Sequence, residues 1–358
     1  MEKIKTTIIL IAVLCFIGAL GGCDCGSGSH KYKAFTLLPL PDWTDKYADS
    51  NKGDMSYFKM SGLVEDLKLT RLQAVELQNH FRDLTAGGET SDKAFDEALK
   101  RVRDFNFESR LEPGKLKHAK FIVAIDMDET LLQQYYSKWK EGSDYYDYKI
   151  KFKDGERGIS MAPGWQQLLQ RIKNRGGLVV LYSANVDEVV WKIAYTVTIG
   201  EKKLAEYVDG VMTNSYLILQ GKNERVGKGK RGNPVVTPSK DLRFLDETLE
   251  KVIIIDDNPK RIIQDSRLRL PKKYQADLYY TNETAKKTYD KQLLHVAGEI
   301  EESALYAEAH GVTFTRAYLP YTELGNAALE WLVETKTFAE TEAIEYIRQH
   351  PDIVDKKF

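Results

Sequence analysis

Three short runs of aliphatic residues, each followed at once by small or acidic polar residues, limit what this chain can fold into. They are Phe121 to Ile125, Leu178 to Tyr182 and Val252 to Ile255. Each run is too short for a helix, and segments with helical periodicity separate them. This alternation predicts an α/β fold with a Rossmann-like parallel sheet and flanking helices. Because such sheets bind ligands outside the carboxyl ends of their strands, we expect the residues that end these runs to meet.

Two of the runs end in a pair of aspartates. Asp126 and Asp128 follow the first run, and Asp256 and Asp257 follow the third. Nearby carboxylates repel one another unless a cation, a shared proton or separate roles relieve the repulsion. Either pair alone is also compatible with a helix cap or a solvated turn. Two pairs at one sheet edge predict a site suited to Mg²⁺, a hard cation that prefers oxygen ligands.

The middle run and one lysine add groups that suit a phosphate. Ser183, Ala184 and Asn185 follow the middle run and offer a hydroxyl and backbone amides. Lys240 precedes the last acidic pair and could neutralise both a phosphate and a nucleophile. On composition alone, a single lysine among many is expected at the surface. Lys240 is therefore a candidate only together with the acidic pairs.

Taken in order, these segments resemble the four motifs of the haloacid dehalogenase (HAD) superfamily of phosphotransferases. The segment from Tyr148 to Asn185 further resembles the small carboxy-terminal-domain phosphatases of the nuclear-LIM-interactor-interacting-factor (NIF) type. The resemblance covers about residues 121–259 and resumes near Thr322. The chain departs from the family at Ala162, where the family usually has Arg, and at Ser183, where it often has Thr. Insertions also precede Lys240 and the closing helix, so the choice of substrate cannot be carried over.

The resemblance implies a phosphomonoester hydrolase that works through an aspartyl-phosphate. It implies that Asp126 is the nucleophile and that Asp128 protonates the leaving group and then activates water. The implied Mg²⁺ ligands are Asp126, the backbone carbonyl of Asp128, Asp257 and, as a weaker candidate, Asp256. Phosphate binding would fall to Thr130, Ser183, Ala184, Asn185 and Lys240, with Thr130 ordering the first loop and Lys240 balancing the charge.

The N-terminus predicts export and a lipid anchor. Lys3 and Lys5 precede an apolar run from Ile8 to Leu20, which is short for a membrane span and has the size of a signal-peptide core. Gly21-Gly22-Cys23 then resembles the processing site of bacterial lipoproteins, which implies a signal peptide over 1–22 and a lipid on Cys23. The alternative is an uncleaved anchor helix. Both place the body in the cell envelope, facing the periplasm or the exterior, and Asp24 resembles the inner-membrane retention signal.

The rest of the chain divides into three parts by composition and pattern. We expect a flexible tether over 23–30, a mainly helical extension over 31–112, and a phosphatase domain over 113–358 with insertions at about 186–239 and 265–316. Two amphipathic stripes in the extension, the first capped by Thr70, fit packing onto the main domain better than a partner-binding face. All three cysteines lie in the first 25 residues, which excludes thiol catalysis and cysteine metal clusters in the body.

A cluster of aromatic residues and a cluster of basic residues each have two possible roles. Tyrosines and a tryptophan after the first motif either line a substrate entrance or pack as ordinary amphipathic side chains; they are Tyr135, Tyr136, Trp139, Tyr145, Tyr146 and Tyr148. A basic run fits a solvated hairpin better than an anion site and comprises Lys222, Arg225, Lys228, Lys230 and Arg231.

The overall charge gives no reason to expect a nucleic-acid partner, because 52 Lys and Arg stand against 53 Asp and Glu. The expected partners are a phosphorylated substrate, either a small phosphomonoester or a phosphopeptide, and the membrane that holds the anchor. Two other functions stay open. One is a broad-specificity acid phosphatase resembling the class C lipoproteins, which share the segment from Asp126 to Thr130. The other is a catalytically silent HAD-fold lipoprotein that binds a partner.

Overall fold

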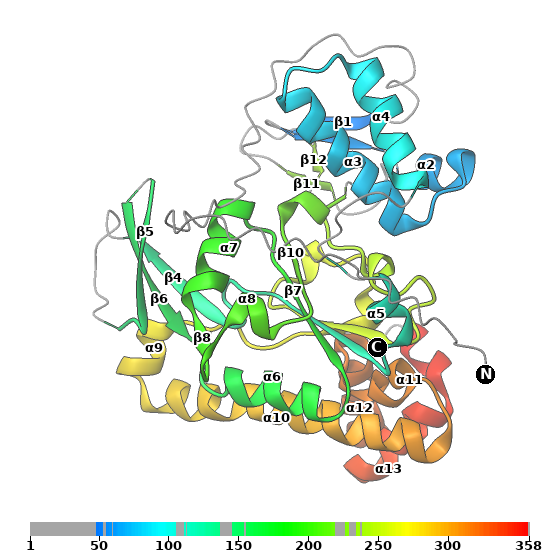
Figure 1. Ribbon diagram of the computed structural model, residues 1–358. Coiled ribbons are helices and arrows are strands. Elements are labelled where there is room, and N and C mark those ends of the chain that lie inside the picture. Colours follow the sequence, from blue (N-terminus) through cyan, green and yellow to red (C-terminus); the bar gives the residue numbers. More distant parts are fainter. Residues whose placement is uncertain are drawn as a thin grey trace, which may run out of the picture.

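The computed structural model describes residues 48–52, 55–58, 60–104, 111, 113–136, 145–153, 155–218, 226–228, 234–236 and 238–356 (Figure 1). The expected signal peptide, Cys23 and the tether lie outside these residues, as do Trp139 and most of the basic run. Within the described ranges, no helix combines the length and the apolar character needed to cross a membrane.

The strands and helices follow the expected alternation. The strands are β1 (Ala48–Lys52), β2 (Met55–Phe58), β3 (Ile122–Ile125), β4 (Leu132–Tyr136), β5 (Tyr148–Phe152), β6 (Gly155–Met161), β7 (Leu178–Tyr182), β8 (Thr198–Ile199), β9 (Lys202–Lys203), β10 (Gly210–Met212), β11 (Val226–Lys228), β12 (Pro234–Val236), β13 (Val252–Ile255) and β14 (Leu268–Arg269). The α-helices are α2 (Met60–Leu67), α3 (Arg71–Ala86), α4 (Ser91–Arg103), α5 (Pro113–His118), α6 (Trp165–Asn174), α7 (Asp187–Thr196), α8 (Leu204–Tyr207), α9 (Ala276–Thr281), α10 (Glu283–His310), α11 (Phe314–Tyr318), α12 (Glu323–Lys336) and α13 (Glu340–Gln349).

A five-stranded sheet in the order β10-β7-β3-β13-β14 forms the centre of the molecule. Every pairing in it is parallel, with Ile122 opposite both Leu178 and Val252. The three aliphatic runs are its three middle strands, and their residues are almost all buried. The predicted α/β fold with a parallel sheet and flanking helices is confirmed.

Alternate residues of the strands face two separate apolar layers, as the period of two in a strand requires. Val123, Ile125 and Val179 face a layer formed with α6, α10 and α11. Ile122, Ala124 and Val180 face the other layer, which is formed with the N-terminal helices α2, α3 and α4. Figure 1 accordingly shows α6 and α10 on one side of the sheet and α2 to α4 on the other. The amphipathic stripes of the N-terminal helices therefore pack onto the sheet.

The helix ends follow local signals in the sequence. The Thr70 hydroxyl accepts a hydrogen bond from the Gln73 amide, and the Gln73 side chain accepts one from the Thr70 amide, which completes a capping box at the start of α3. The long helix α10 ends at Gly311, whose φ of 63° lies in the left-handed region that glycine adopts without strain. The cap at Thr70 was predicted from the sequence and is confirmed.

A small antiparallel sheet in the order β4-β6-β5 follows the first motif, and we call it the flap. It stands at one end of the central sheet, above α9 in Figure 1. Tyr135 and Tyr148 of the flap pack against the core, whereas Tyr145 is exposed and its ring stacks on Tyr280 at 4.5 Å between centroids. The tyrosines of this segment thus divide between packing and exposure.

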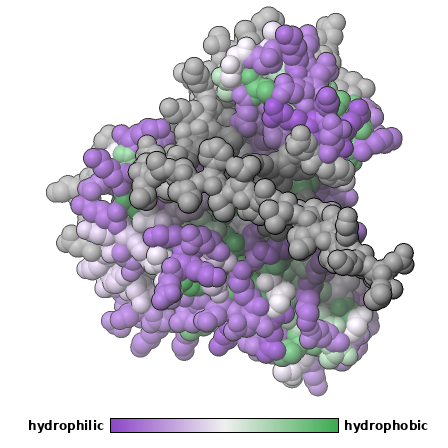
Figure 2. Space-filling model, viewed as in Figure 1, coloured by the Kyte–Doolittle hydropathy of each residue, from purple (hydrophilic) through white to green (hydrophobic). Residues whose placement is uncertain are grey.

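The C-terminal helices α12 and α13 form a third apolar cluster beside α10 and α11. The buried Arg348 fixes them, because its guanidinium donates to Glu302 at 2.9 and 2.5 Å and to the backbone oxygen of Ala317. Among the coloured residues on the face that Figure 2 shows, most are hydrophilic and a smaller number of apolar residues are scattered between them.

Candidate active site

The loop after β3 joins the first and last motifs at the edge of the central sheet. The Asp126 amide donates to the backbone oxygen of Ile255 at 2.9 Å, which continues the pairing of β3 with β13. The buried Thr130 hydroxyl accepts from the Asp257 amide and donates to an Asp257 carboxylate oxygen, both at 3.2 Å. Glu129 turns the loop with a φ of 66° and forms an ion pair with Lys273. The two acidic pairs therefore share one edge.

Lys240 lies between the two acidic pairs. Its Nζ donates to Asp126 Oδ1 and to Asp256 Oδ2, each at 2.6 Å, and its side chain is 1 % exposed. The backbone of Lys240 is also fixed, because its amide donates to the backbone oxygen of Arg261 and its backbone oxygen accepts from the amide of Ile263. The surface position that composition alone suggested is wrong, because two carboxylates offset the cost of burying this charge.

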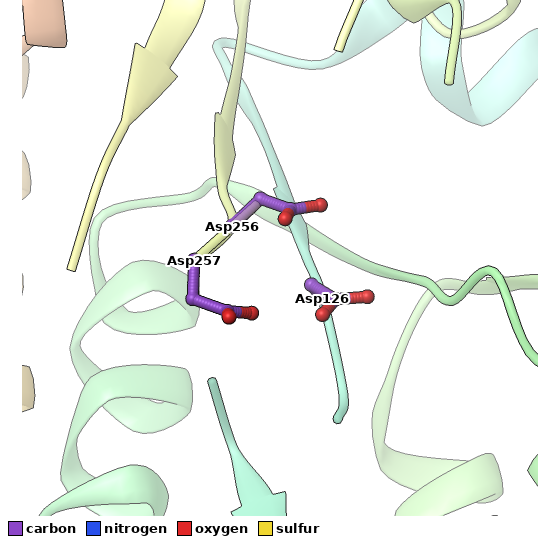
Figure 3. Close-up of side chains that lie close together, drawn as sticks. All are labelled: Asp126, Asp256 and Asp257. Atoms are coloured by element: carbon purple, nitrogen blue, oxygen red, sulfur yellow. The ribbon is translucent and has the colours of Figure 1, made fainter. Parts of the chain in front are cut away.

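Three carboxyl groups, those of Asp126, Asp256 and Asp257, each offer an oxygen within 4.8 Å of the others and could hold a metal ion (Figure 3). Figure 3 shows the Asp257 side chain directed toward Asp126 from the end of β13. Both Asp256 oxygens receive protein donors, Oδ1 from the Asn258 amide at 2.8 Å and Oδ2 from Lys240. An all-oxygen donor set of this kind suits a hard divalent cation.

The electrostatics of the site favour binding of an added cation. Burial raises the pKa of Asp126, against the opposing effect of Lys240. Burial, followed by repulsion from Asp256 and Glu129, raises the pKa of Asp257 to about 6. Burial alone would lower the pKa of Lys240, but Asp126 and Asp256 outweigh it and raise that pKa. One ammonium group thus faces several carboxylates, and a divalent cation would relieve the repulsion that remains.

The Asp128 carboxylate is held by side chains from two other segments. Its Oδ1 accepts a hydrogen bond from the side-chain amide of Gln134 in the flap. Its Oδ2 accepts one from the side-chain amide of Asn185 at 3.3 Å. Burial raises the pKa of Asp128, and these two donors oppose the shift. Sequence reasoning missed Gln134, because a glutamine six residues after an acidic motif carries no recognisable signal.

The residues after β7 lie at the same edge, but with different degrees of access. Ser183 is fully buried, and its hydroxyl accepts a hydrogen bond from the backbone amide of Asn185 at 3.1 Å. Ala184 and Asn185 are half-buried, and the Asn185 side chain reaches Asp128. The structure therefore brings together the predicted catalytic, phosphate-binding and metal-binding residues at the ends of β3, β7 and β13, with Lys240 between the acidic pairs.

Comparison with known families decides the type of protein. The family model of the NLI interacting factor-like phosphatases matches residues 121–307, which is slightly more than half of the chain. The chain belongs to this family. It is therefore a phosphatase of the HAD-like type, and the resemblance inferred from the motifs is confirmed. The matched range runs from β3 through most of α10 and includes every candidate catalytic, phosphate-binding and metal-binding residue.

Solved structures similar to this chain include two of Fcp1, an RNA polymerase II CTD phosphatase. One is a fission yeast Fcp1 variant bound to beryllium fluoride, with 13 % identity, a TM-score of 0.32, and coverage of 70 % of this chain and 72 % of Fcp1. The other Fcp1 structure has 13 % identity and a TM-score of 0.33, and covers 65 % and 71 %. No curated protein sequence shows significant similarity to the chain.

Proposed function

We propose that this phosphatase hydrolyses phosphomonoesters through an aspartyl-phosphate on Asp126, with Mg²⁺ as its cofactor. The observation that carries the proposal is the position of Asp126, which directly follows the central strand β3, is 7 % exposed and contacts Lys240 at 2.6 Å. A carboxylate attacks an anionic phosphate only where positive charge offsets their repulsion. Lys240 supplies part of that charge and opposes the rise in the pKa of Asp126 that burial causes.

The two half-reactions use Asp126 and Asp128 in turn. An Asp126 oxygen bonds to phosphorus, the ester P–O bond breaks, and Asp128 gives its proton to the leaving oxygen. Water then attacks the phosphorus of the aspartyl-phosphate, Asp128 takes the proton from that water, and inorganic phosphate leaves with the Asp126 carboxylate restored. These two roles of Asp128 follow from microscopic reversibility. The backbone amides of Ala184 and Asn185 and the Ser183 hydroxyl lie at the edge where phosphate oxygens would bind.

The residues present fit a magnesium ion. Asp126 and Asp257 offer carboxylate oxygens, and Asp256 lies beside them. The backbone carbonyl of Asp128 would complete the donor set. When bound, the ion would neutralise the phosphoryl oxygens and bring the two anions together. Thr130 would keep Asp257 oriented, because its hydroxyl both donates to and accepts from that residue.

The test is hydrolysis of p-nitrophenyl phosphate by the full chain in detergent. We expect turnover with Mg²⁺, none with chelator, and none in Asp126→Asn, whose circular dichroism should match that of the parent. Turnover that persists in Asp126→Asn would refute the nucleophile assignment. A folded chain that binds Mg²⁺ but turns over no phosphomonoester would favour the silent binding protein, and fast turnover of many small esters would favour the class C-like acid phosphatase.

We also propose that the chain is a lipoprotein of the bacterial cell envelope, anchored through Cys23. The support is the order of Lys3, Lys5, the apolar run to Leu20, and Gly21-Gly22-Cys23. The chain expressed in a bacterial host with labelled palmitate should incorporate label and partition into detergent. Cys23→Ala should take up no label and should stay unprocessed, whereas the uncleaved-helix alternative predicts that neither chain takes up label or is processed.

A further inference from the structure

Two polar side chains of the flap, Arg157 and Gln134, connect it to Asp128 through hydrogen bonds. Arg157 of β6 donates from Nη1 to Gln134 Oε1 at 3.1 Å, and the Gln134 amide nitrogen then donates to Asp128 Oδ1. Arg157 is 7 % exposed, and its guanidinium lies over the Phe152 ring at 4.3 Å. The flap is thereby connected to the carboxylate through hydrogen bonds in which every donor and acceptor is defined.

The orientation of the Gln134 amide follows from what Arg157 can do. A guanidinium group only donates hydrogen bonds, so the Gln134 atom that faces it must be the oxygen. The nitrogen must then face Asp128, where it donates to the carboxylate. The same logic applies on the other side, because the Asn185 oxygen accepts from the Val186 amide at 2.8 Å. The Asn185 nitrogen is left to face Asp128 Oδ2.

We propose that Gln134 and Asn185 are positioning residues that hold one oxygen each of the Asp128 carboxylate, and that Arg157 fixes the Gln134 amide for this task. The inference rests on the proposed function, in which Asp128 transfers a proton to the leaving group. Two donors on opposite oxygens fix both the position and the rotation of the carboxyl plane. Proton transfer needs a donor within hydrogen-bond reach of its target, so a small rotation of Asp128 lowers the rate.

This geometry makes the flap part of the support for the Asp128 carboxylate. Gln134 lies on β4 and Arg157 lies on β6, which pair in antiparallel register, with Tyr136 opposite Arg157. Correct placement of Asp128 therefore depends on correct pairing of the flap strands, although Asp128 itself belongs to the loop after β3. Gln133, the neighbour of Gln134, instead accepts from the Ala276 amide at 2.7 Å and from the Tyr135 hydroxyl at 2.8 Å. It offers a matched control for loss of polar contacts in the same strand.

The experiment measures kcat/KM for two phosphate esters, p-nitrophenyl phosphate and ethyl phosphate, in the full chain. This parameter reports the steps up to departure of the leaving group. p-Nitrophenolate leaves with little help from an acid, whereas ethoxide needs a proton. Misplacing Asp128 should therefore cost about 10-fold more with ethyl phosphate than with p-nitrophenyl phosphate, within the range of general acid catalysis.

Four variants separate the possible causes. Asp128→Asn and Gln134→Leu should both show the larger loss with ethyl phosphate, and Gln133→Leu should lower the two kcat/KM values equally or leave them unchanged. Gln134→Glu retains the side-chain size and an acceptor for Arg157 but has no donor for Asp128, so it should resemble Gln134→Leu. If Asp128→Asn shows no leaving-group dependence, the proposed acid role of Asp128 fails. If Asp128→Asn shows it and Gln134→Leu and Gln134→Glu do not, the positioning role is wrong.

A second measurement needs no turnover. With ¹⁵N-labelled glutamine, the Gln134 side-chain amide is identified by its loss in Gln134→Leu. Its bonded proton should resonate downfield of the other glutamine amides, and the signal should shift in Asp128→Asn. An unshifted signal in Asp128→Asn would overturn the hydrogen bond on which the inference rests, whatever the esters show.

Discussion

At the residue scale, the buried ammonium group of Lys240 is the most demanding feature of the site. A charged side chain at 1 % exposure is stable only where opposite charge and hydrogen bonds replace water, and here two carboxylates do so at 2.6 Å each. Asp256 also receives the Asn258 amide, which spreads its charge further. Removing the lysine would leave two buried carboxylates facing each other, which is worse than the loss of one ion pair.

We therefore expect Lys240→Met to abolish turnover and to lower the free energy of unfolding by about 3 kcal/mol, the magnitude typical when one partner of a buried ion pair is removed. Urea denaturation in the presence of chelator measures this, since an added cation would replace the missing charge. The double variant Lys240→Met/Asp256→Asn should regain part of the lost stability, because it also removes one of the repelling carboxylates. A double variant that is no more stable than Lys240→Met would contradict this account.

Asp209 gives the fold a second charge cluster away from the site, with a defined pH dependence. Its carboxylate contacts Lys115 at 2.8 Å and Lys173 at 3.1 Å and accepts from the Val179 amide at 2.9 Å. Burial alone would raise the pKa of Asp209, but these partners outweigh it and lower that pKa. Since the pKa in the folded state lies below its value in the unfolded chain, the stabilisation is present above about pH 4 and is lost as the pH falls further.

Asp209→Asn should accordingly be less stable than the parent at pH 6, and the difference should shrink as the pH falls toward 3. Urea unfolding midpoints at both pH values measure it. A difference that is the same at pH 6 and pH 3 would mean that the charge of Asp209 is not what stabilises the amino end of β7.

At the element scale, the structure separates elements that carry a local signal from those that exist only through pairing. The runs that became β3, β7 and β13, the cap at Thr70 and the end of α10 at Gly311 could be predicted because burial, capping and backbone freedom act over a few residues. Strands such as β10 and β14 are too short for a periodic pattern and form because a neighbouring strand offers hydrogen bonds. The Gln134 and Arg157 contacts were missed for a related reason, since they depend on the register of the flap.

The two long N-terminal helices provide a matched test of capping. Thr70 and Thr90 hold the same position before α3 and α4, but only the Thr70 side chain makes a capping hydrogen bond. We expect Thr70→Ala to lower the free energy of unfolding by about 1 kcal/mol. Thr90→Ala should cost much less, because it removes no such bond. Urea denaturation of the two variants checks this, and equal losses would show that the capping box does not contribute.

At the scale of the whole molecule, the N-terminal helices and the phosphatase sheet share one apolar layer. Leu77 and Phe81 of α3 belong to the same cluster as Ile122 and Ile254 of the sheet. Polar contacts cross the same boundary, since Tyr216 donates to Glu76 at 2.9 Å and Arg82 donates to the backbone oxygen of Ser215. The helices thus cover a face of the sheet that would otherwise be apolar and exposed, so the two parts should unfold together.

Leu77→Ala tests this cooperativity. The side chain is fully buried, and its loss should lower the free energy of unfolding by about 3 kcal/mol through lost contacts and a cavity. Trp139, Trp165, Trp191 and Trp331 lie in the phosphatase part, and Trp43 is replaced by Phe in both the parent and the variant, so that no tryptophan reports on the N-terminal part. If the two parts unfold together, Leu77→Ala should move the tryptophan fluorescence transition as far as the circular dichroism transition. If the helices unfold on their own, the fluorescence midpoint should stay at the parent value while the circular dichroism curve gains an earlier step, because only the helical signal would then report the loss.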